Sequence, residues 1–124
     1  MARILIIDDE PEIRALLTKM LEREGYEVIE APDGEVGVKL FRENPTDLVI
    51  TDIHMPNKLG LDVIADLRVL SPDVKIIAIS GGDPSFVGAD VSLEGARIFG
   101  AQKALPKPLE REQVLKAVRE LLDE

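Results

Sequence analysis

The sequence predicts one α/β domain with a five-stranded parallel sheet, strand order 2-1-3-4-5, and helices on both faces of the sheet. Short runs rich in Ile, Val and Leu alternate with segments whose apolar residues recur at helical spacing. Such alternating units form parallel sheets, because each crossover helix returns the chain to the same end of the sheet. Of the two common doubly wound strand orders, this one fits a chain of 124 residues.

The expected strands are short apolar runs, as is typical of strands buried on both faces. The last strand is expected to end at Pro106, because proline is tolerated only at a sheet edge or a strand end. Their ranges are Arg3–Asp8, Tyr26–Ala31, Asp47–Asp52, Val74–Ile79 and Lys103–Pro106.

The expected helices carry start and stop signals. Asp9 or Glu10 lies near the N-cap of the first helix, Pro11 suits its first turn, and Gly25 fits its C-terminal stop. The later helices are expected from Gly34 to Glu43, Leu61 to Leu70, Asp90 to Phe99 and Glu110 to Leu122. The first two are expected to pack through apolar residues, namely Ile13, Leu16, Leu17, Met20 and Leu21, and then Val36, Val38, Leu40 and Phe41.

The composition excludes several classes of protein. A net charge of −9 argues against nucleic acid or an anionic membrane as the direct partner. The absence of cysteine excludes disulfides, thiolate catalysis and cysteine-based zinc sites. No apolar stretch approaches the ~20 residues of a membrane span, and the opening MARILII is too short for the core of a signal peptide. We therefore expect a cytoplasmic protein.

Five polar side chains end separate strands of the predicted sheet. Asp8 and Asp9 follow the first strand, Asp52 ends the third, Ser80 follows the fourth and Lys107 follows the fifth. In an open parallel sheet, reacting groups gather at the carboxyl ends of the strands, at the point where the strand order reverses. We therefore expect one site rather than scattered surface residues.

This set of residues suits phosphoryl chemistry. Three neighbouring carboxylates repel one another, so either one is protonated or a cation neutralises them. An all-oxygen site suits Mg²⁺, and a carboxylate can attack phosphorus to form an aspartyl phosphate. The phosphoryl oxygens then need a positive charge and a hydroxyl donor, for which Lys107 and Ser80 are suitable residue types.

The segments ILIIDDEP, DLVITDIHMP, IIAISG and ALPKP, in this order and spacing, resemble the receiver domain of two-component response regulators along essentially the whole chain. The resemblance implies the flavodoxin-like receiver fold, with Asp52 as the phosphoacceptor. It further implies that Asp8, Asp9 and Asp52 hold Mg²⁺ or Mn²⁺, and that the backbone carbonyl of His54 completes the metal shell.

The resemblance also assigns roles around the phosphoryl group. Ser80 matches the switch hydroxyl that turns toward it, and Lys107 matches the lysine that stabilises it. Pro108 matches the following proline, whose peptide bond is usually cis in this family. Gly81 is a supporting residue that lets backbone donors approach the phosphoryl group, with a plain loop as the equal alternative.

The function implied is that of a stand-alone receiver domain over residues 1–124, without an output domain. It takes a phosphoryl group from a histidine kinase or a histidine phosphotransfer protein and signals through a downstream protein effector. It catalyses only its own phosphorylation and dephosphorylation.

Two departures from the family pattern concern signal output. Most receivers place an aromatic residue three positions before the lysine, whereas this chain has Ala104 there. The usual aromatic switch is therefore absent, and output has to rely on backbone shifts or another side chain. The stretch Gly81–Ala89 is also long and rich in glycine, which indicates a remodelled connection after the fourth strand.

Other interpretations of the same residues remain. Asp8 and Asp9 also suit capping of the first helix, and Lys107 also suits a solvated surface position. Because of Ala104, the chain is also compatible with a docking module that is never phosphorylated. A phosphatase with an aspartyl intermediate is disfavoured, because His54 stands where such enzymes commonly have their acidic residue.

Overall fold

The computed structural model describes residues 2–53, 60–80 and 100–122. Five parallel strands form one sheet in the order β2-β1-β3-β4-β5, which confirms the predicted strand order. The strands are β1 (Arg3–Ile7), β2 (Glu27–Ala31), β3 (Leu48–Asp52), β4 (Lys75–Ser80) and β5 (Lys103–Pro106). The helices are α1 (Pro11–Arg23), α2 (Gly34–Glu43), α3 (Gly60–Leu70) and α5 (Arg111–Leu122).

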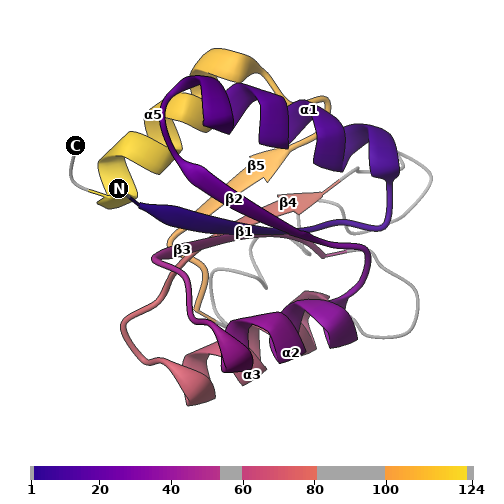
Figure 1. Cartoon of the computed structure of the whole chain (residues 1–124), viewed down its shortest axis with the longest axis vertical. Helices are drawn as coiled ribbons and strands as arrows, with labels where there is room; N and C mark the ends of the chain where they lie inside the picture. The colour runs from indigo at the N-terminus through magenta and orange to yellow at the C-terminus, as the bar shows by residue number, and fades with distance from the viewer. Residues whose placement is uncertain (1, 54–59, 81–99, 123–124) are drawn as a thin grey trace.

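Helices cover both faces of the sheet, with α1 and α5 on one side and α2 and α3 on the other (Figure 1). Alternation along the strands divides the core in two. In β1, Ile4 and Ile6 pack in the cluster with α1 and α5, whereas Leu5 and Ile7 pack in the cluster with α2 and α3. The central strands β1, β3 and β4 therefore need apolar residues at consecutive positions, which is the pattern that their sequences show, whereas the edge strand β2 carries Glu27 and Glu30.

The helix boundaries follow the expected signals. Asp33 is the N-cap of α2, and its Oδ1 accepts a hydrogen bond of 2.9 Å from the backbone N–H of Val36. Gly25 follows α1 with φ +91, a left-handed conformation that favours glycine. Glu10 is the N-cap of α1, but its side chain makes no capping hydrogen bond. The Glu10 carboxylate is consequently not engaged in starting the helix.

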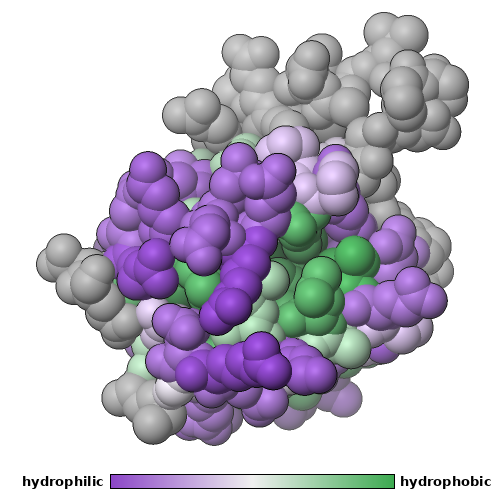
Figure 2. All heavy atoms as spheres, turned by 90° about the horizontal axis from the view of Figure 1, so that it is seen from above, coloured by the Kyte–Doolittle hydropathy of each residue, from purple (hydrophilic) through white to green (hydrophobic). Residues whose placement is uncertain are grey.

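Two residues expected in the core are exposed instead. Leu16 is 47% exposed, because it lies at the margin of the stripe through which α1 contacts the sheet. Figure 2 shows the side of the molecule formed by α1 and α5, where hydrophobic residues lie between hydrophilic ones. Val36 is 36% exposed, because α2 contacts the sheet through Gly37, Val38 and Phe41 on its other side.

Some expectations fall outside the described residues. The helix expected from Asp90 to Phe99 and the stretch Gly81–Ala89 belong to this group. Within residues 2–53, 60–80 and 100–122, no helix has the length and apolar character needed to cross a membrane.

Candidate functional site

The central strands bring three carboxylates together. Asp8 directly follows β1 and Asp52 is the last residue of β3, and these two strands are neighbours in the sheet. One carboxylate oxygen from each of Asp8, Asp9 and Asp52 lies within 4.8 Å of the others. Asp8 and Asp52 are buried, whereas Asp9 is exposed. The predicted acidic cluster is therefore present, with one side open to solvent.

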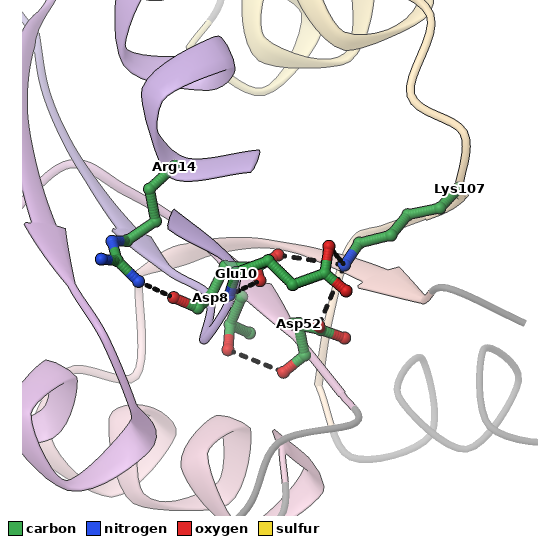
Figure 3. A network of polar contacts seen from close by, with 6 residues as sticks. Asp8, Glu10, Arg14, Asp52 and Lys107 are labelled. Carbon is green, nitrogen blue, oxygen red and sulfur yellow. Dashed lines mark hydrogen bonds and ion pairs between the residues drawn. The ribbon is translucent and has the colours of Figure 1, made fainter. Parts of the chain in front are cut away.

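Lys107 reaches this cluster from the loop after β5 (Figure 3). Its Nζ lies 3.1 Å from Asp52 Oδ2 and 3.2 Å from Asp8 Oδ2, and only 9% of its side chain is exposed. Its backbone N–H donates a hydrogen bond of 2.7 Å to the carbonyl of Ser80, which is buried at the end of β4. The peptide bond between Lys107 and Pro108 is cis, as the resemblance implied. Four adjacent strands, β1, β3, β4 and β5, thus contribute residues to one site.

Burial and neighbouring charges both shift pKa values within this site. Burial raises the pKa of the Asp8 carboxyl, and the nearby Asp52 charge raises it further; the Glu10 amide and Lys107 only partly oppose these effects. Burial alone would lower the pKa of Lys107, but the Asp52 and Asp8 carboxylates outweigh it and raise this pKa above its ordinary value. Lys107 therefore stays an ammonium group, and the cluster keeps an excess of negative charge.

The donor set fits a hard divalent cation. Asp8 Oδ2 is fully buried, and apart from its ion pair with Lys107 it accepts no hydrogen bond from the described part of the chain. A buried carboxylate oxygen in this state is a ready ligand. Mg²⁺ prefers oxygen ligands, usually one or two carboxylates with water completing the shell. The acidic pocket of Asp8, Asp9 and Asp52 thus fits Mg²⁺ binding.

Two residues near the cluster were not predicted as part of the site. Glu10 Oε2 lies 3.6 Å from Lys107 Nζ, so a further carboxylate shares this ammonium group. Arg14 Nη1 donates a hydrogen bond of 2.6 Å to the Asp8 carbonyl, and Arg14 Nε lies 3.5 Å from Glu30 Oε1. The only signal for Glu10 in the sequence is its position after the acidic pair. Arg14 has no such signal, because its contacts arise from the path of α1 beside β2.

The remaining predicted positions are more distant or not described. His54 and Gly81 lie outside the described residues, so their predicted roles stay predictions. Ala104 lies half-buried in β5, opposite Ala78 of β4. The roles of the described site residues likewise rest on their placement and on the resemblance.

Comparisons with known proteins identify a family that matches most of the chain. Residues 4–119 match the family model of the response regulator receiver domain. The chain is 36% identical to PilH of Pseudomonas aeruginosa, with 98% of each chain covered. It is 38% identical to BvgA of Bordetella pertussis over 78% of its own length but spans only 47% of that protein.

A solved structure has the same fold. The response regulator TrrA of Thermotoga maritima, solved in complex with Mg²⁺ and BeF, is 36% identical to this chain. The two superpose with a TM-score of 0.82, covering 98% of this chain and 99% of the other. The fold, the acidic pocket and these matches agree, and the chain belongs to the family of response regulator receiver domains of two-component signalling systems.

Proposed function

We propose that this chain is a phosphoacceptor that takes a phosphoryl group on Asp52 from a histidine kinase or a histidine phosphotransfer protein. The observation that carries this proposal is the position of Lys107. Its ammonium lies within 3.2 Å of carboxylates at the ends of two different strands. A cation held there, beside a buried carboxylate, would stabilise the charge of an incoming phosphoryl group.

In the proposed reaction, a carboxylate oxygen of Asp52 attacks the phosphorus atom of a phosphohistidine. The new P–O bond forms as the P–N bond breaks, and the imidazole nitrogen leaves with the electron pair. The product is an aspartyl phosphate, which water later hydrolyses. Lys107 would neutralise phosphoryl oxygens, and Ser80 at the end of β4 would supply a hydroxyl donor.

Asp8, Asp9 and Asp52 are the described residues that would hold Mg²⁺ or Mn²⁺, together with the backbone carbonyl of His54. The bound cation supplies charge neutralisation between the carboxylates and the phosphoryl oxygens. The Mg²⁺ present in the TrrA structure supports this choice of cation.

The signal would then pass to a downstream protein effector in the cytoplasm. Residues 1–124 would act as one receiver domain, since the family match spans residues 4–119. The net charge of −9 supports a protein partner rather than nucleic acid or a membrane.

The test is phosphorylation by a small donor. We expect acetyl phosphate or phosphoramidate with Mg²⁺ to add the mass of one phosphoryl group to the intact chain, and Asp52→Asn to abolish the gain. Asp62→Asn is the matched control, because Asp62 is exposed on α3 and lies outside the acidic cluster. A wild-type chain that gains no mass, or an Asp52→Asn variant that gains it equally, would contradict the proposal.

A second candidate function is a docking module that is never phosphorylated. The observation in its favour is Ala104 in β5, where the family usually has an aromatic residue. Equal binding of an effector by the wild type and by Asp52→Asn, with and without a phosphodonor, would favour this candidate.

A further inference from the structure

Glu10 is the solvent-exposed carboxylate of the group around Lys107. Its side chain is 57% exposed, whereas the side chains of Asp8 and Asp52 are almost completely buried. In Figure 3 the Glu10 carboxylate points to the Lys107 ammonium, as do Asp8 and Asp52. Glu10 thus places a negative charge on the open side of the site.

The backbone holds Glu10 in this place. Its N–H donates a hydrogen bond of 2.8 Å to Asp8 Oδ1, and its carbonyl accepts hydrogen bonds of 3.1 Å from the N–H groups of Ile13 and Arg14. Within the described ranges, Lys107 is the only cation that forms an ion pair with Glu10. Since Lys107 is shared with two other carboxylates, the charge of Glu10 is not fully compensated.

The charge of Glu10 is close enough to act on the reaction. The distances from Lys107 Nζ to Glu10 Oε2 and to Asp52 Oδ2 are 3.6 Å and 3.1 Å. Glu10 Oε2 is therefore within about 7 Å of Asp52 Oδ2, which is less than the Debye length of about 8 Å at physiological ionic strength.

We propose that Glu10 is a specificity-determining residue for the phosphoryl donor, favouring donors with a nitrogen leaving group over donors with an anionic oxygen leaving group. This inference rests on the proposed function. In an in-line transfer the leaving group departs on the side away from Asp52, toward solvent. Glu10 is the exposed carboxylate of the group around Lys107, on the solvent side of the buried Asp52, and it is not a proposed metal ligand.

The two kinds of donor differ in the charge they bring to this side. In acetyl phosphate the P–O bond breaks and acetate leaves with the electron pair as an anion, which Glu10 repels. In phosphoramidate the nitrogen already carries its protons, so that the P–N bond breaks and neutral ammonia leaves with the electron pair. A phosphohistidine behaves like phosphoramidate, because its protonated imidazole leaves as a neutral ring.

The experiment compares wild type, Glu10→Gln and Glu12→Gln with both donors, at saturating Mg²⁺. Glu12 is the matched control, because it is exposed in the first turn of α1 and forms no ion pair with the described residues. We expect Glu10→Gln to raise the rate with acetyl phosphate relative to phosphoramidate by about threefold or more, the scale for one charge at this distance in solvent. High salt should reduce the difference in donor ratio between Glu10→Gln and wild type, because salt screens the charge of Glu10.

Two results would overturn the inference alone: a donor ratio that Glu10→Gln leaves unchanged while the wild type is phosphorylated, or an equal shift in Glu12→Gln. Calorimetry measures the Mg²⁺ affinity of each variant and so gives the Mg²⁺ concentration that saturates it. If the shift in the donor ratio appears only below saturating Mg²⁺, Glu10 acts on the cation and not on the donor, and the inference is wrong. A wild type that neither donor phosphorylates would overturn the proposed function as well.

Discussion

Lys107 Nζ lies 3.1 Å from Asp52 Oδ2, although the two residues are 55 positions apart in the chain. The same ammonium lies 3.2 Å from Asp8 Oδ2, so one cation from the β5 loop joins the ends of β1 and β3. This contact compensates part of the negative charge that the fold concentrates at the centre of the sheet. Charges buried in this way are strongly coupled, so removing one of them should change the electrostatic energy of the others.

Lys107→Met keeps most of the length of the side chain and removes its charge. We expect phosphorylation of Asp52 to slow by about 100-fold or more, the usual cost of losing a donor to developing charge. We also expect Mg²⁺ to bind more tightly, because the ammonium competes with the cation for Asp8 and Asp52. Phosphorylation rates and calorimetric titration test both effects. Lys103→Met is the control, because Lys103 pairs with Glu120 at the surface; an unchanged rate or weaker Mg²⁺ binding would contradict the prediction.

Asp8→Asn should stabilise the protein at neutral pH when divalent cations are absent. Burial and the Asp52 charge raise the pKa of Asp8 in the folded state. A raised pKa contributes stability below the unfolded value, near 3.8, and this contribution is lost as pH rises through the folded value. At pH 7 the ionised carboxylate therefore opposes folding, and we expect Asp8→Asn to gain about 1 kcal/mol.

Urea unfolding in the presence of EDTA measures this effect across pH. The gain from Asp8→Asn should shrink toward acid pH, where the wild-type carboxyl is protonated. Added Mg²⁺ should reverse the order, because only the wild type keeps the complete set of carboxylates. The exposed Asp62→Asn should change the free energy of unfolding by less than about 0.5 kcal/mol. An Asp8→Asn variant less stable than wild type at pH 7 without cations would show that Lys107 outweighs the burial of Asp8.

Arg14→Ala should weaken Mg²⁺ binding, although it leaves all three carboxylates of the cluster in the sequence. Arg14 donates to the Asp8 carbonyl and so orients the turn that carries Asp8 and Asp9. Loss of such an outer partner typically lowers metal affinity about 10-fold or more. Calorimetry in the absence of phosphodonor gives the affinity directly. Arg14→Lys should retain part of it, and Arg23→Ala, at the exposed end of α1, should retain all of it.

Gly37→Ala should destabilise the fold by about 1–3 kcal/mol through overpacking. A Cβ at this position of α2 would lie 2.7 Å from Ile7 Cγ1 and closer still to Ile7 Cδ1, and Ile7 is fully buried. Lys39→Ala is the control on the exposed side of the same helix and should be nearly neutral. Combining Gly37→Ala with Ile7→Val, which removes Cδ1, should cost less than the sum of the two single changes. Additive costs in urea unfolding would argue against the predicted clash.

Much of the molecule follows from local sequence patterns. The apolar runs that end in Asp52 and Ser80 predict two of the strands to within one residue, and the β5 boundaries agree with the prediction. Asp33 and Gly25 mark helix ends, because capping and left-handed backbone depend on neighbouring residues only. Since parallel strands end at the same edge, the meeting of Asp8 with Asp52 could also be predicted.

Other features depend on how the elements pack, and no local pattern reveals them. The exposure of Leu16 and Val36 depends on which side of each helix meets the sheet, although both residues are apolar. Arg14 reaches the Asp8 carbonyl only because α1 runs beside β2, where Glu30 forms an ion pair with the same guanidinium group. The sequence alone therefore yields the strand order, as one of the two common doubly wound orders, and the acidic cluster, which follows from where the strands end. Packing alone yields the sharing of Lys107 among three carboxylates, because long side chains meet according to their directions in space and not their order in the chain.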